Sequence, residues 1–353
     1  MPSPLLTEIP LFQLSGLRLG HAQDEEAKTG VTVLLFDKEA KAGVDISGGG
    51  PASRETPLAS PLTADNPINA IVLSGGSAYG LAAGDGVMRY LEEHGIGYPT
   101  GFARVPLVCQ SCIYDLGMGR ADVRPDAAMG YEACVNAEKE NAPAYPVSPH
   151  HPKTITREQI GAAYNRVLSG SIGAGCGASV GKLCGMERSM KSGVGVYAVS
   201  LGNLQMAAVV VVNALGDIFD PRTGEKKAGL LSEDQTSFAD SCEELYRISQ
   251  RTDLFTGSTD GAADGTVTGT AGTTNTTIGA VITNGRFSKA ELSKIASMTR
   301  CAYARCIRPV GTLADGDSIY AVSMGEVPAD INVAGTLAAE VMEQAILRAV
   351  NAC

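Results

Sequence analysis

The sequence predicts a mixed α/β protein in which two β-sheets are covered by helices. Two observations lead to this fold class. Short apolar runs alternate along the chain with longer segments of helical character. The five consecutive apolar residues 208–212 are typical of a strand that is buried on both faces, as in a sheet covered by helices. The length of 353 residues allows one large domain or two smaller ones.

The first third of the chain carries several strand signals. Residues 31–36 and 42–46 are predicted strands, and the second of them runs into the glycine turn 47–51. A further strand, residues 70–74, leads through a glycine turn into a helix of small residues that reaches about Glu93. The glycines of this turn do not match a dinucleotide-binding pattern, and no basic residue is near. We therefore expect close helix packing here.

Residues 102–115 form a mostly apolar run, and a proline-started helix is predicted for residues 125–137. The following residues 138–157 are rich in proline and polar side chains, which indicates a surface loop. His150 and His151 lie in this loop without a third metal ligand nearby, so we expect them to be solvated.

A glycine-rich stretch, residues 169–181, precedes Lys182. The phosphate-binding P-loop pattern fails there, because it requires glycine at Cys176 and Ser or Thr at Leu183. The glycines are expected to let the backbone pass close to another part of the protein. From the residues alone, Lys182 is expected to be a surface lysine at the rim of this contact. This stretch therefore gives no nucleotide site.

Residues 194–212 predict a β-hairpin whose second strand ends at Asn213. An amide at the end of a buried strand either caps a turn or donates a hydrogen bond to an oxyanion, and we favour the second role. Residues 217–274 are polar and irregular, with moderate helical character at 232–250.

The C-terminal part contains two predicted helices and a short acidic turn. A capping box at Ser288 and Glu291 begins a helix that continues to Arg300, and residues 333–350 form an amphipathic helix. The acidic turn Asp315-Gly316-Asp317 leads into a strand. It lacks the further oxygen ligands and the terminal glutamate of an EF-hand, so we expect no calcium or other metal site.

Thr276 is the candidate nucleophile. It lies between a glycine- and threonine-rich approach from about Thr256 and a predicted buried strand, residues 278–282. Cleavage of the Asn275–Thr276 bond would give Thr276 a hydroxyl nucleophile and a free α-amine on one residue. An α-amine titrates near pH ~8, so it can serve as the base near neutrality.

These motifs, in this order, resemble those of the P1 family of D/L- and β-aminopeptidases and nylon-oligomer hydrolases. The resemblance covers roughly residues 31–350 and depends on Asn275-Thr276-Thr277, Asp315-Gly316-Asp317, the Gly181-Lys182 loop and the Val-rich strand that ends at Asn213. It implies a four-layer αββα sandwich of the N-terminal-nucleophile hydrolase type. It also implies one catalytic domain, residues 1–353, that cuts itself into fragments 1–275 and 276–353, and a homotetramer.

The resemblance further implies a role for each site residue. Tyr114 would enter the active-site cleft. Lys182 would lower the pKa of the Thr276 α-amine or stabilise developing negative charge. Asp315 and Asp317 would orient the ammonium and hydroxyl groups of Thr276, and Asn213 would stabilise the oxyanion. No cofactor is implied.

The expected activity is hydrolysis of small peptides or linear aliphatic amides, such as 6-aminohexanoate oligomers, through an acyl-enzyme on Thr276. Two alternatives remain open from the sequence. The first is acyl transfer of the kind catalysed by ornithine acetyltransferases. The second is an uncleaved binding protein that keeps the fold without catalysis.

Composition narrows the possible partners and the compartment. The net charge of −10 argues against nucleic acid, because phosphate binding needs a basic surface. No run of about 20 apolar residues is present, so no membrane span is expected, and the N-terminus lacks a signal pattern. Nine scattered cysteines indicate a reduced, cytoplasmic protein. We expect Cys109 and Cys112 to be ordinary buried thiols.

Overall fold

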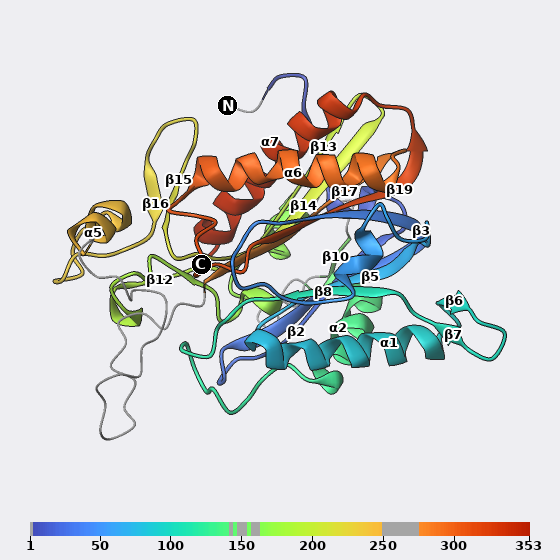
Figure 1. Ribbon diagram of the computed structural model, residues 1–353, viewed down its shortest axis with the longest axis horizontal. Helices are drawn as coiled ribbons and strands as arrows, with labels where there is room; N and C mark the ends of the chain where they lie inside the picture. The colour runs from blue at the N-terminus through green and yellow to red at the C-terminus, as the bar shows by residue number, and fades with distance from the viewer. Residues whose placement is uncertain (1–2, 141–143, 147–153, 157–162, 249–274) are drawn as a thin grey trace.

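The computed structural model describes residues 3–140, 144–146, 154–156, 163–248 and 275–353. These residues form four layers (Figure 1). Helices α6 (Lys289–Cys306) and α7 (Ile331–Asn351) cover one sheet, and helices α1 (Ala83–Glu93) and α2 (Ala127–Glu140) cover the other. The two sheets face each other between the helix layers, which confirms the predicted αββα sandwich.

The first sheet carries the candidate nucleophile. Its order is β1 (Thr7–Glu8), β13 (Val194–Leu201), β14 (Leu204–Asn213), β17 (Thr276–Gly285), β19 (Ser318–Val327) and one end of β3 (Thr29–Ile46). Strand β17 is antiparallel to β14 and parallel to β19. The register pairs Thr276 with Asn213 and Ile278 with Ser318. The end of β14 and the starts of β17 and β19 therefore lie side by side at the same end of these central strands.

The second sheet contains β2 (Leu17–Asp24), β3, β5 (Ile68–Ser74), β8 (Val108–Cys112) and β4 (Ala52–Arg54). Strand β3 joins the two sheets. Its residues 29–36 pair with β2, and its residues 41–46 pair with β19. Because one 18-residue strand belongs to both sheets, the residues that follow β3, from Ser47, lie beside the start of β19.

Three apolar layers hold the sandwich together. Side chains from both sheets, such as Leu34, Ile71 and Ile278, fill the space between them. Strand alternation explains the run at 208–212: Val209 and Val211 lie in this inter-sheet layer, and the alternate residues pack against α6 and α7. The predicted burial of this strand on both faces is confirmed.

Several predicted boundaries need correction. The apolar run 102–115 is a strand only at β7 (Arg104–Val105) and β8, because Pro106 cannot donate to a β-ladder. In the described part of 232–250, the only helix is α5 (Ser241–Arg247), which begins at the N-cap Asp240. The polar region before it pairs locally as β15 (Asp217–Phe219) and β16 (Lys226–Ala228). His150, His151 and the approach to Asn275 lie outside the described residues.

The remaining elements are short. Helix α4 covers Tyr164–Val167, and the strands are β6 (Tyr98–Pro99), β9 (Ala144–Pro146), β10 (Thr154–Thr156), β11 (Ser179–Val180), β12 (Met190–Lys191) and β18 (Ile307–Arg308). Within the described residues, five 3₁₀ turns span Leu11–Gln13, Thr56–Ala59, Ser77–Ala82, Gly173–Gly175 and Met186–Arg188. Within the described residues, no helix combines the length and the apolar character needed to cross a bilayer.

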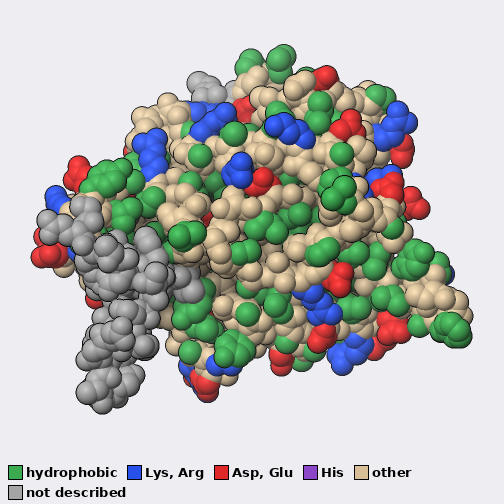
Figure 2. Space-filling view, in the orientation of Figure 1, with side chains coloured by type: hydrophobic (Ala, Val, Ile, Leu, Met, Phe, Trp, Pro, Cys, Tyr) green, Lys and Arg blue, Asp and Glu red, His purple; other side chains and the backbone are tan. Residues whose placement is uncertain are grey.

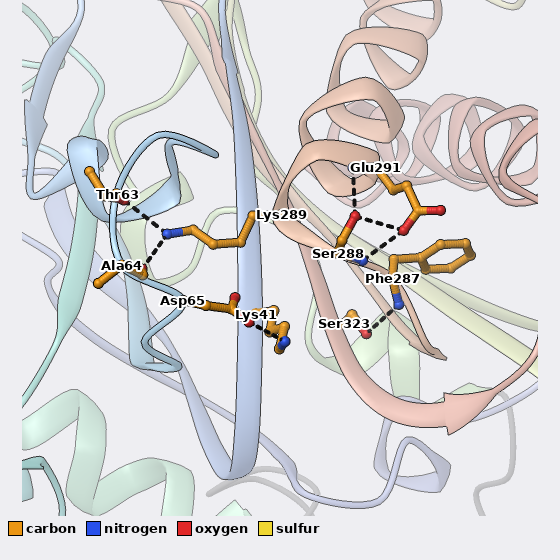
Figure 3. Close-up of polar contacts among 9 residues, drawn as sticks. All are labelled: Lys41, Thr63, Ala64, Asp65, Phe287, Ser288, Lys289, Glu291 and Ser323. Atoms are coloured by element: carbon orange, nitrogen blue, oxygen red, sulfur yellow. Dashed lines mark hydrogen bonds and ion pairs between the residues drawn. The ribbon is translucent and has the colours of Figure 1, made fainter.

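The start of α6 is anchored by the predicted capping box and by a buried lysine (Figure 3). Lys289 donates hydrogen bonds from Nζ to Thr63 Oγ1 (2.9 Å) and to the carbonyl oxygen of Ala64 (2.8 Å). Burial lowers the pKa of the Lys289 ammonium. Lys289 therefore ties the loop after β4 to the helix layer, far along the strands from Thr276.

The surface carries charges of both signs. Figure 2 shows Lys and Arg side chains interspersed with Asp and Glu over the face in view. Many form exposed pairs such as Arg120–Asp122, and exposed pairs contribute at most about 1 kcal/mol each. The stability of the fold therefore rests mainly on the three apolar layers.

Candidate active site

Thr276 is the first residue of β17, and its hydroxyl lies against the peptide bond that the sequence marks for cleavage. Its side chain is buried, with 5% of the residue exposed. Thr276 Oγ1 donates a hydrogen bond to the carbonyl oxygen of Asn275 (2.5 Å). The same oxygen accepts a hydrogen bond from the backbone N–H of Gly316 (2.8 Å). A nucleophilic hydroxyl and a hydrogen-bond donor thus converge on one carbonyl group.

The two aspartates of the acidic turn are both buried, and they bind different partners. Asp315 Oδ2 accepts hydrogen bonds from the backbone N–H (2.8 Å) and Oγ1 (2.7 Å) of Thr312, which closes the turn. Asp317 Oδ1 accepts from the backbone N–H of Thr277 (2.6 Å), directly after the candidate nucleophile. The turn is thereby fixed to the start of β17.

Burial strongly affects the protonation of this turn. Burial and the neighbouring Asp315 raise the pKa of the Asp317 carboxyl to about 8. Burial also raises the pKa of Asp315. A cavity of about 360 Å³ between α6 and the turn reaches Asp317, and Ser47, Arg300 and Gly311 are among its lining residues. Asp317 can therefore exchange protons close to neutral pH.

Lys182 lies on the loop after β11, and it is buried with 7% exposed, so the surface position expected from the residues alone is wrong. The physical reason is its polar partners: Nζ donates to Asn213 Oδ1 (2.8 Å) and to the Asn213 carbonyl oxygen (3.0 Å). Burial lowers the pKa of Lys182 to about 7, although Asp315, Asp115 and Asp317 oppose this shift.

Asn213 links the lysine to the strand end near Tyr114. Its Oδ1 accepts from Lys182 and from the backbone N–H of Ser179 (3.1 Å), and its Nδ2 donates to the carbonyl oxygen of Tyr114 (2.9 Å). Tyr114 itself is half-buried, and its backbone makes this contact. The structure thus brings together all six candidate residues from five separate parts of the chain: Tyr114, Lys182, Asn213, Thr276, and the pair Asp315 and Asp317.

Sequence reasoning missed one buried acid, Asp115. Its Oδ1 accepts from the backbone N–H of Gly76 (2.7 Å), and its Oδ2 accepts from Thr29 Oγ1 (2.7 Å). Burial raises the pKa of Asp115, and the nearby Lys182 opposes that shift. The available signal was an acid directly after an apolar strand, but this pattern is equally typical of a surface turn.

The Asp317→Asn variant is expected to change how stability depends on pH. The raised pKa means that the folded chain keeps a proton which the unfolded chain releases between about pH 4 and 8. Wild-type stability should therefore fall across this window, by up to about 1.4 kcal/mol per pH unit relative to the variant. Urea unfolding of uncut Thr276→Ala protein, with and without Asp317→Asn, at pH 4 to 8 measures this difference, and parallel curves would contradict it.

The fold and the site together define an N-terminal-nucleophile hydrolase architecture, and comparison with known proteins agrees. The model of peptidase family S58 matches residues 11–353. The chain superposes on the L-aminopeptidase D-Ala-esterase/amidase of Ochrobactrum anthropi, which is described as a variant of the Ntn hydrolase fold, with a TM-score of 0.62 and 15% identity over 96% of this chain and 85% of that one. It also superposes on a Burkholderia sp. β-aminopeptidase with a TM-score of 0.59 and 16% identity, over 96% and 84% of the two chains.

Curated relatives give the same family at higher identity. An uncharacterized aminopeptidase of Mycobacterium leprae is 34% identical over 90% of this chain and 79% of its own length. A 6-aminohexanoate-oligomer endohydrolase of Kocuria sp. is 31% identical over 96% of this chain and 85% of its own length. The chain belongs to peptidase family S58, which confirms the resemblance drawn from its motifs. It is accordingly a hydrolase of peptide or amide bonds with an N-terminal-nucleophile fold.

Within the described residues, no group of three or more His, Cys, Asp or Glu side chains is placed to hold a metal ion. All nine cysteines are free thiols, and Cys109 and Cys112 are both buried. Burial raises the pKa of each of these two thiols to about 12. Neither of these two thiols is therefore activated as a thiolate near neutral pH.

Proposed function

We propose that the chain cuts its own Asn275–Thr276 bond and then hydrolyses amide bonds through an acyl-enzyme on Thr276. One observation carries this proposal: Thr276 Oγ1 lies 2.5 Å from the carbonyl oxygen of Asn275, at the start of an inner strand. Cleavage there would give Thr276 a free α-amine that acts as its base. Asp317, bound to the next residue, would position the new N-terminus.

The substrate step follows from the same arrangement. Thr276 Oγ would attack the substrate carbonyl, Asn213 and Lys182 would stabilise negative charge nearby, and water would release the acyl group. We propose small peptides or linear aliphatic amides as substrates, because relatives are named aminopeptidases and 6-aminohexanoate-oligomer endohydrolases. Aminolysis by an added amine in preference to hydrolysis would instead favour an acyltransferase.

The two fragments are expected to stay associated after cleavage. Strand β17 of the C-terminal fragment lies between β14 of the N-terminal fragment and β19, and β19 pairs on its other side with β3. Helices α6 and α7 bury apolar side chains against strands from both fragments. Separation would expose this layer and break the three ladders β14–β17, β3–β19 and β15–β18, so association of the fragments is favoured. A homotetramer and a cytoplasmic location remain proposals, the latter because the nine thiols are free.

Intact mass of freshly purified protein tests the proposal. We expect two species instead of one 36.4-kDa chain, and N-terminal sequencing of the smaller species should begin Thr-Thr-Ile-Gly. A single chain that stays uncut for days at neutral pH would remove the free amine that the mechanism needs. That outcome would favour the non-catalytic binding protein.

A further inference from the structure

We infer that the backbone N–H of Gly316 is the oxyanion donor for cleavage of the Asn275–Thr276 bond, and that the triglycine segment Gly48-Gly49-Gly50 holds it in place. This inference rests on the proposed self-cleavage. It assigns the precursor cut to a donor other than Asn213, the residue that the sequence indicates for oxyanion stabilisation.

The geometry at the scissile carbonyl supports Gly316. Its N–H lies 2.8 Å from the carbonyl oxygen of Asn275, within the range typical of oxyanion-hole donors. The Nδ2 of Asn213 instead donates to the carbonyl oxygen of Tyr114. Asn275 is fixed on its other side too, because its own N–H donates to the carbonyl oxygen of Ala314 (3.0 Å). The bond to be cut is therefore clamped between two backbone groups of the acidic turn.

The chemistry that this donor serves is an N-to-O acyl shift. Thr276 Oγ forms a bond to the carbonyl carbon of Asn275, whose oxygen gains negative charge that the Gly316 N–H stabilises. The carbon–nitrogen bond then breaks, and the hydroxyl proton ends on the new α-amine of Thr276. Water next hydrolyses the ester, adding its hydroxyl to Asn275 and a proton to Oγ.

The triglycine segment places the turn that carries this donor. Gly50 N–H donates to the carbonyl oxygen of Asp315 (2.9 Å), and Gly48 N–H donates to that of Asp317 (3.2 Å). A Cβ at position 48 would lie 2.2 Å from the backbone nitrogen of Asp317, so only glycine fits there. These contacts bracket residue 316 on both sides.

Space around Gly316 is equally restricted. A Cβ at position 316 would lie 2.9 Å from Thr276 Oγ1 and 2.8 Å from the carbonyl oxygen of Gly50. The absence of a side chain thus lets the N–H, the triglycine segment and the nucleophile approach each other. This explains the glycine between the two aspartates, which the roles of Asp315 and Asp317 leave unexplained.

The test replaces single backbone N–H groups by oxygen, using glycolic acid incorporated at position 316 in cell-free synthesis of the full chain. Self-cleavage of this ester variant should slow by about 100- to 1,000-fold, the usual cost of losing one oxyanion donor. The matched control carries the same change at position 224, where the N–H donates to the carbonyl oxygen of Asp220 in an exposed turn (2.8 Å). It should cut within about threefold of the wild-type rate, and thermal unfolding should show that both variants are folded.

The outcomes separate this inference from the proposed function. A cut wild type with a position-316 variant that cuts equally fast, or with both ester variants equally slow, would overturn the role of Gly316 and leave self-cleavage standing. An uncut wild type would overturn both. If the position-316 ester does not fold, Gly316→Ala is the second test. Self-cleavage of this variant at the wild-type rate, with a Cβ 2.9 Å from Thr276 Oγ1, would contradict the proposed approach of Gly316 to the nucleophile. Gly117→Ala, where a Cβ meets its nearest atom at 3.7 Å, is its control.

Discussion

Replacement of Thr276 by alanine is expected to abolish both self-cleavage and amide hydrolysis. Alanine removes the only hydroxyl hydrogen-bonded to the Asn275 carbonyl oxygen within the described residues. The loss of a nucleophile typically lowers turnover by roughly 10⁴-fold or more. Intact mass should therefore show one chain of undiminished length, and release of free amine from short peptides or 6-aminohexanoate oligomers should fall to background.

Thr276→Ser is the matched variant, since it keeps the hydroxyl and removes only a methyl group. It should still cut itself, and a small fragment that begins with serine would show that the hydroxyl, and not the shape of the strand start, is required. Thermal unfolding should show that uncut Thr276→Ala is folded, because strand β17 keeps its ladder to β14 and β19. Cleavage in the alanine variant would refute Thr276 as the nucleophile.

Replacement of Lys182 by methionine is expected to reduce stability and self-cleavage together. Methionine fills a similar volume but removes the Lys182 donor from both oxygens of Asn213, so that Oδ1 keeps only the N–H of Ser179. It also removes the cation that faces Asp115, Asp315 and Asp317. Loss of one partner from a buried charged group typically costs about 3–5 kcal/mol. Urea unfolding of uncut protein, compared in a Thr276→Ala background, measures this cost without the complication of cleavage.

Lys289→Met provides the control, because Lys289 is a comparably buried lysine at the other end of the sheet (Figure 3). Its Nζ bonds only neutral oxygens, those of Thr63 and Ala64. We expect a loss of about 1–2 kcal/mol and unchanged self-cleavage. Equal loss of cleavage in both variants would mean that Lys182 acts through general stability and not within the site.

The family and the layer order could be predicted from the sequence because their signals are local. A strand buried on both faces reads as a continuous apolar run, as at residues 208–212, and the Ser288 capping box marks a helix start within four residues. The motifs around Thr276 and Asp315 are equally short. Such patterns depend on side chains and on near neighbours, so they survive in the sequence without a structure.

The tertiary structure alone decided how these motifs meet. The pairing of Thr276 with Asn213 is a strand register between residues far apart in the chain. Backbone groups form the β-bridge between Asn275 and Asp315 and the hydrogen bond from Gly50 to the same turn. Almost every residue carries these groups. No side-chain pattern encodes them, so neither the Gly316 donor nor its support could be found from the sequence.

The charges of the site divide in the same way. The sequence identified Lys182, Asp315 and Asp317 as polar residues in glycine-rich turns, where solvent exposure is the ordinary expectation. Their burial depends on layers contributed by both sheets, and burial is what moves the pKa of Lys182 down and that of Asp317 up toward neutrality. The sequence by itself determined which groups are present, and the packing of distant segments determined their protonation.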